Sequence, residues 1–101
     1  MTINEAQTIV EKHIKKIGYD KIETLPSHAF IHLMEEIGEV ARIILYQETK
    51  RSEMKNNSKP HDIEDEVADV LWQTLKLASY LKIDLEKAFE NKYQKNLLKN
   101  K

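Results

Sequence analysis

Apolar residues recur every three or four positions along most of this chain, which is the periodicity of amphipathic α-helices. The first such stretch follows Thr2, which fits a helix-starting capping box with Glu5, and it ends before Gly18, a common helix terminator. Its apolar positions are Ile3, Ala6, Val10, Ile14 and Ile17. The pattern predicts a first helix that ends close to Gly18.

A second, longer helix is predicted from about Pro26 to about Lys50, because proline suits the first turn of a helix. Its apolar arc is wider than a lone surface helix needs. The arc consists of Phe30, Leu33, Met34, Ile37, Val40, Ala41, Ile44 and Leu45, with Ala29 and Ile43 beside them. The polar stretch that follows, residues 50–60, is interpreted as a mobile loop.

Two more helices are predicted in the last 40 or so residues of the chain. One begins near His61, has acidic residues in its first turn where they complement the helix dipole, and continues to Leu81. Asp84 is the expected N-cap of the last helix, which fades by Leu98. With no strand pattern, we expect an all-α fold: a four-helix bundle-like protomer, one domain over residues 1–101, completed by oligomerisation.

Composition narrows the possible classes of function. The chain has 101 residues, of which 41% are hydrophobic and 33% charged, and its net charge of −1 lacks the basic excess of nucleic-acid binders. The absence of cysteine excludes disulfides, thiolate metal sites and cysteine nucleophiles. No apolar run approaches the ~18 residues that cross a bilayer, and the first ten residues lack a signal-peptide core. We therefore expect a cytoplasmic protein.

Two pairs of acidic residues lie within apolar helical segments. Glu36 and Glu39 form one pair and Glu66 and Asp69 the other, because residues three apart share a face of a helix. Burial and mutual repulsion make such carboxylates costly unless a cation neutralises them. Oxygen ligands without sulfur or convergent histidines favour a hard ion, Mg²⁺ or alternatively Mn²⁺. The two pairs together predict a metal site between two helices.

Other interpretations of the acidic pairs stay open at this point. A single pair of this kind usually marks a solvated helix face, and only the presence of two pairs in packable segments favours a site. A carboxylate di-iron centre would use Glu-x-x-His pairs, which the sequence lacks. The chain is alternatively a non-catalytic helical dimerisation module, although such a module would be more stable with apolar residues in place of the acids.

The acidic pairs and their surroundings resemble MazG-type nucleotide pyrophosphohydrolases, of the all-α NTP pyrophosphatase superfamily. The similar segments are residues 32–41, 65–71 and 83–89, followed by Lys92 and Asn96. The resemblance implies Mg²⁺-dependent hydrolysis of nucleoside triphosphates, or their deoxy forms, to the monophosphate and pyrophosphate. Phosphoribosyl-ATP pyrophosphohydrolase shares the acid pattern and is the alternative, but the ending Lys92-x-x-x-Asn96 is more similar to the MazG-type branch.

The resemblance also implies roles for individual residues. The metal ligands would be Glu36, Glu39, Glu66 and Asp69, the residue that activates the attacking water would be Glu35 or Glu36, and Lys92 and Asn96 would contact the phosphates or sugar. Family members form dimers or tetramers whose helices complete one another's sites. We therefore expect a homodimer or homotetramer that takes a nucleoside triphosphate and partners neither nucleic acid nor membrane. The base, the sugar and the number of metal ions do not follow from the sequence.

A few further residues have roles that the sequence leaves open. Trp72 is expected in the core or an interface, with stacking on a base as the alternative. His32, one turn before the first acidic pair, is either a partner of a carboxylate or an ordinary polar helix residue. Gln73, one turn beyond the second pair, is a candidate to face the same site. The basic stretch 50–59 is interpreted as a solvated linker, or else as a loop that closes over phosphates. Many family members carry arginines where this chain has residues 97–101, and lysine lacks their forked guanidinium.

Overall fold

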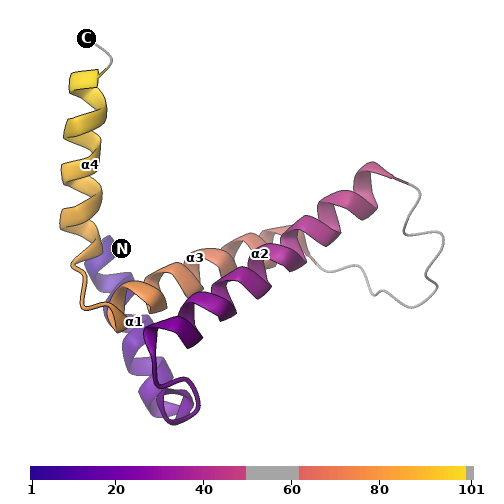
Figure 1. Ribbon diagram of the computed structural model, residues 1–101, viewed down its shortest axis with the longest axis horizontal. Coiled ribbons are helices and arrows are strands. Elements are labelled where there is room, and N and C mark those ends of the chain that lie inside the picture. The colour runs from indigo at the N-terminus through magenta and orange to yellow at the C-terminus, as the bar shows by residue number, and fades with distance from the viewer. Residues whose placement is uncertain (50–61, 100–101) are drawn as a thin grey trace.

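The structure is a computed structural model that describes residues 1–49 and 62–99. In those ranges the chain forms four α-helices and a short 3₁₀ turn, without a strand, which confirms the predicted all-α class (Figure 1). The elements are α1 (Ile3–Lys16), η1 (Tyr19–Lys21), α2 (Pro26–Glu48), α3 (Ile63–Tyr80) and α4 (Leu85–Lys99). The predicted loop over residues 50–60 and the expected helix start near His61 lie outside the described residues.

Local hydrogen bonds explain where α1 and α4 begin. Thr2 Oγ1 accepts the backbone N–H of Glu5 at 3.1 Å, and Glu5 Oε1 accepts that of Thr2 at 3.0 Å, which is the predicted capping box. Gly18 follows α1 with a φ of 75°, a left-handed conformation that glycine adopts without strain. Asp84 Oδ1 accepts the backbone N–H of Lys87 at 3.1 Å, so Asp84 caps α4 as predicted.

The start of α2 uses a cap that the sequence did not reveal. His28 Nδ1 accepts the backbone N–H of Thr24 at 3.1 Å and that of Leu25 at 3.3 Å. His28 is the third residue of α2 and takes the place that Glu or Gln holds in the usual capping box, so no sequence pattern singled it out. The contact fixes the entry of the chain into α2, the helix that carries the first acidic pair.

α2 and α3 run antiparallel side by side, and α1 packs across the C-terminal half of α3 (Figure 1). The core lies where α1 meets α3 and consists of Val10, Ile14 and Leu75. Trp72 packs against this core, with its ring edge-to-face with that of His13 at 5.4 Å between centroids. Trp72 is half-buried and packs against the core, which agrees with the first of its two interpretations.

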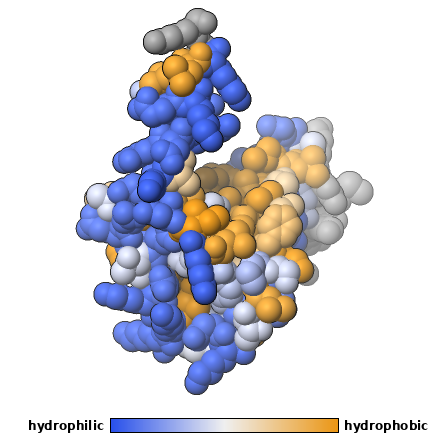
Figure 2. Space-filling model, turned by 60° about the vertical axis from the view of Figure 1, so that its left-hand side comes forward, coloured by the Kyte–Doolittle hydropathy of each residue, from blue (hydrophilic) through white to orange (hydrophobic). Residues whose placement is uncertain are grey.

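α4 projects away from the rest of the molecule instead of lying alongside the other helices (Figures 1 and 2). Its base is attached to α1 by polar contacts: Gln7 Nε2 donates to the Ile83 carbonyl at 2.8 Å, and Asn4 Nδ2 donates to Glu86 Oε2 at 3.2 Å. From Lys87 to Lys99 every residue of α4 is exposed. The bundle-like body is thus formed by α1, α2 and α3.

The apolar arc of α2 faces away from α3 over much of its length. Phe30, Met34, Ile37, Ala41 and Ile44, which we call the outer stripe, are all exposed. The large side chains among them are 41–50% exposed, while Ala29, on the opposite side toward the interior, is 0% exposed. Figure 2 shows hydrophobic side chains gathered on the surface of the body below α4. Across residues 1–49 and 62–99, every helix is too short or too polar to span a lipid bilayer.

Candidate metal centre

Three of the four predicted metal ligands converge between α2 and α3. Glu36 and Glu39 stand three residues apart on one face of α2, and Glu66, in the first turn of α3, comes from the antiparallel neighbour. One carboxylate oxygen of each lies within 4.8 Å of the other two. Asp69, one turn further along α3, is exposed and is not part of this close group, although its charge acts on Glu36 and Glu66.

Burial and mutual repulsion raise the pKa of two of these carboxyls. Glu66 is only 8% exposed, and burial raises the pKa of its carboxyl, with a hydrogen bond and negative charge from Glu39 raising this pKa further. Burial likewise raises the pKa of Glu36, the charges of Glu39 and Asp69 add to the increase, and His32 opposes it. Positive charge placed among carboxylates this close would favour their ionised forms.

The chemistry of these side chains fits a divalent hard cation. The donors are all carboxylate oxygens from two helices, and two of the three residues are only half-buried. Mg²⁺ prefers such partial sets, because it keeps water and substrate phosphate oxygens in its remaining positions. Residues Glu36, Glu39 and Glu66 would hold the cation, and Asp69 lies close enough to add its charge.

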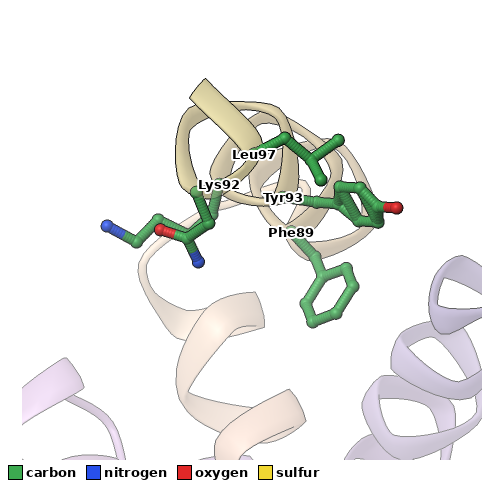
Figure 3. A pocket seen from close by; sticks show the side chains of 5 residues that line it. Phe89, Lys92, Tyr93 and Leu97 are labelled. Carbon is green, nitrogen blue, oxygen red and sulfur yellow. The ribbon is translucent and has the colours of Figure 1, made fainter. Parts of the chain in front are cut away.

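The other predicted site residues lie outside the carboxylate group of one chain. Glu35 is exposed beside Glu36, on a neighbouring side of α2. Lys92 and Asn96 lie on α4, which follows the C-terminal end of α3, whereas Glu66 lies near the N-terminal end of that helix (Figure 1). Both residues line a shallow pocket formed by side chains of α4 alone. The side chains of Lys92 and Tyr93 extend from this helix in opposite directions (Figure 3). The lining residues are Phe89, Lys92, Tyr93, Asn96 and Leu97.

One protein-family model matches most of the chain. The model of the MazG nucleotide pyrophosphohydrolase domain matches residues 26–99, a range that includes every predicted site residue. The chain belongs to this family. A search of curated proteins and a search of solved structures gave no match. Membership makes the chain a nucleotide pyrophosphohydrolase by family, and the acidic cluster agrees with the divalent metals that MazG domains generally use.

This MazG domain also contains a buried ionic cluster that sequence reasoning missed. Lys76 of α3 is 1% exposed, and its Nζ lies 2.7 Å from Glu23 Oε1. The second oxygen of Glu23 lies 2.7 Å from His32 Nδ1, and Lys76 Nζ stands over the ring of Tyr19 at 5.3 Å. A lysine flanked by Leu75, Leu77 and Ala78 was the available signal, because such a position is rarely occupied by an unpartnered charge.

The charges of this cluster offset the cost of burial. Burial alone would raise the pKa of Glu23, but the hydrogen bonds and charges of Lys76 and His32 lower it overall. Burial and the nearby charge of Glu23 raise the pKa of the Tyr19 hydroxyl. Tyr80 donates its hydroxyl hydrogen to the Glu23 carbonyl oxygen, which holds the same segment from another side. Glu23, which lies between η1 and α2, is thus held against α3.

The ionic cluster reaches the carboxylate group through His32. His32 Nε2 lies 3.4 Å from Glu36 Oε1, which agrees with the interpretation of His32 as a partner of a carboxylate. Gln73 is buried on α3, 7% exposed, and its Oε1 has no hydrogen-bond partner within the described part of the chain. The surface between α2 and α3 is therefore polar along much of its length.

Proposed function

We propose that this MazG domain hydrolyses nucleoside triphosphates or deoxynucleoside triphosphates to the nucleoside monophosphate and pyrophosphate in a Mg²⁺-dependent reaction. The observation that carries the proposal is the convergence of Glu36, Glu39 and Glu66 from two helices in the family to which the chain belongs. Mn²⁺ is the alternative ion, because it accepts the same oxygen ligands. The proposal includes one domain over residues 1–101 and a cytoplasmic location, where nucleotides are the available substrates.

The proposed ligands are Glu36, Glu39, Glu66 and Asp69. When held by these residues, the cation would neutralise phosphate charge and increase the electrophilicity of the phosphorus atom. A carboxylate accepts the proton of the attacking water as the new oxygen–phosphorus bond forms and the pyrophosphate oxygen leaves. Glu36 and Glu35 are the candidates for this role: Glu36 belongs to the carboxylate group, and the exposed Glu35 stands next to it in α2.

A homodimer or homotetramer is the second part of the proposal. The outer stripe of α2 repeats at alternating steps of four and three residues over Phe30, Met34, Ile37, Ala41 and Ile44, the spacing of helices that pack against a partner helix. A second copy that covers this stripe would remove large, half-exposed apolar side chains from water. The same assembly would allow Lys92 and Asn96 of the projecting α4 to reach the phosphates bound by a neighbouring copy.

The test is a screen of the common ribo- and deoxyribonucleoside triphosphates with Mg²⁺, with phosphoribosyl-ATP included, that measures pyrophosphate against orthophosphate. We expect pyrophosphate release from at least one nucleoside triphosphate. Release from phosphoribosyl-ATP alone would favour the alternative enzyme. No release from any substrate, together with a melting temperature that Mg²⁺ does not change, would indicate a non-catalytic module.

Variants of the ligands make the assignment specific. Glu39→Gln and Asp69→Asn should each abolish pyrophosphate release and leave the helical circular dichroism signal unchanged, because the amides keep the shape and lose the charge. Glu64→Gln is the matched control, since Glu64 is an exposed acid of the same first turn of α3 and lies outside the carboxylate group. Unaltered turnover in either ligand variant would refute the assigned ligands.

A further inference from the structure

We propose that His32 is a positioning residue: through its Nε2 it fixes the Glu36 carboxylate as a cation ligand, while Glu23 and Lys76 hold the imidazole ring in place. The proposal rests on the proposed function only in that the carboxylate group binds a divalent cation.

The geometry places the imidazole between two carboxylates. Nδ1 of His32 lies 2.7 Å from Glu23 Oε2 and 2.8 Å from Lys76 Nζ, and Nε2 lies 3.4 Å from Glu36 Oε1. The ring also lies 5.8 Å from that of Tyr19, between centroids. Three elements, η1, α2 and α3, therefore contribute to the orientation of one ring.

The hydrogen on Nε2 follows from what surrounds each nitrogen. An ionised carboxylate only accepts hydrogen bonds, so the approach of Nε2 to Glu36 is attractive when Nε2 carries a hydrogen. With its hydrogen on Nε2, the neutral ring accepts at Nδ1 from the Lys76 ammonium, which also donates to Glu23. We assign this form, because it satisfies Lys76 on one side of the ring and presents Nε2–H to Glu36 on the other.

The burial of Lys76 is hard to explain by stability alone. A buried ion pair is often replaceable by apolar residues of similar size without loss of stability, and Lys76 is 1% exposed in a helix with leucine and alanine neighbours. In metal sites, the groups that hydrogen-bond to a ligand set its orientation and its affinity for the ion. The Glu23–Lys76 pair ends at His32, and His32 contacts Glu36, so the ionic cluster is continuous with the carboxylate group.

The experiment compares two amides at one position. Gln carries its amide nitrogen near the place of Nε2, and Asn carries its amide near the place of Nδ1. His32→Gln therefore retains the donor toward Glu36, while His32→Asn retains contact with Glu23 and Lys76 and loses the donor. Mn²⁺ is the probe, and its binding to the full chain is measured from the electron paramagnetic resonance signal of the free ion. The melting temperature of each variant without metal reports on folding.

We expect His32→Asn to bind Mn²⁺ about 10-fold more weakly than the wild type and His32→Gln to stay close to it. His13→Asn is the control, because His13 contacts Trp72 and no carboxylate of the group. Equal affinities in both His32 variants, whether unchanged or weakened, would overturn the positioning role of Nε2. A wild-type chain that binds no Mn²⁺ would contradict the proposed function itself, and this inference with it.

Discussion

Replacing Lys76 with methionine tests whether the buried ion pair holds the segment before α2 against α3. Methionine keeps most of the apolar stem and removes the ammonium, so Glu23 stays in place without its closest cation. The side chains of Lys76 and Glu23 are 2% and 12% exposed, and their charged atoms are 2.7 Å apart. Removal of one partner from a buried pair costs about 3–5 kcal/mol. Because Glu23 retains some solvent and its contact with His32, we expect the lower end of that range.

A loss of about 3 kcal/mol corresponds to a decrease of roughly 12 °C or more in the melting temperature of a domain of this size. Thermal and urea unfolding followed by circular dichroism measure it, at one protein concentration throughout. Lys15→Met is the matched control, because Lys15 pairs with Glu11 at 3.4 Å on the surface, where its side chain is 66% exposed. An exposed pair of this kind contributes less than about 1 kcal/mol.

A second substitution decides the origin of the effect. When Glu23→Gln is added to Lys76→Met, the buried charge that lost its partner is removed as well, so the double variant should be more stable than Lys76→Met alone. If Lys76→Met unfolds at the wild-type temperature, or if the two substitutions lower stability additively, the ion pair does not hold this segment and the reasoning fails.

Three further predictions follow from the same structure. The pKa values of Glu36 and Glu66 are raised above the ordinary 4.5, so each carboxyl stabilises the fold below pH 4.5 and loses this stabilisation as the pH rises through its raised pKa. The pKa of Glu23 is lowered, so Glu23 stabilises the fold above pH 4.5 and loses this stabilisation as the pH falls through its lowered pKa. The melting temperature without metal should therefore rise as the pH falls from 7 toward 4.5 and decrease again in stronger acid. Saturating Mg²⁺ should flatten the first part of this curve, and a curve that Mg²⁺ leaves unchanged would contradict the prediction. Ile37→Lys, in the middle of the outer stripe, should reduce the mass measured by light scattering to that of one chain, while Lys16→Glu, on α1, should not. Lys82 adopts a φ of 57° after α3, so Lys82→Gly should stabilise the chain by about 1 kcal/mol, and a loss of stability on urea unfolding would show that this conformation carries no strain.

Local patterns predicted the helices well. The Thr2 capping box, the proline start of α2 and the Asp84 cap all lie where the sequence placed them, because each depends on residues within one turn. The same holds within each acidic pair, since helical spacing alone puts Glu36 and Glu39 on one face. That Glu66 joins them depends on the antiparallel packing of α2 on α3, which the apolar character of both segments indicated.

What the sequence did not predict depends on contacts between distant segments. Glu23 and Lys76 are 53 residues apart, and neither has a periodic signal that points to the other. The wide apolar arc of α2 also has two possible inward faces, and periodicity does not say which of them meets α3. The structure turns the row through Ala29, His32 and Glu36 inward and leaves Phe30, Met34 and Ile37 outside. The exposed position of Asp69, outside the close group, likewise depends on the rotation of α3 and not on spacing.

The polar interior between α2 and α3 sets stability against the proposed metal binding in this chain. A substitution such as Glu66→Leu would make the isolated protomer easier to fold, because it removes a buried acid whose pKa is raised. The same substitution would remove a proposed ligand. Selection for a more robust fold alone would therefore remove the proposed metal site first at its most buried position. Laboratory evolution for thermal tolerance without a substrate should recover hydrophobic replacements there.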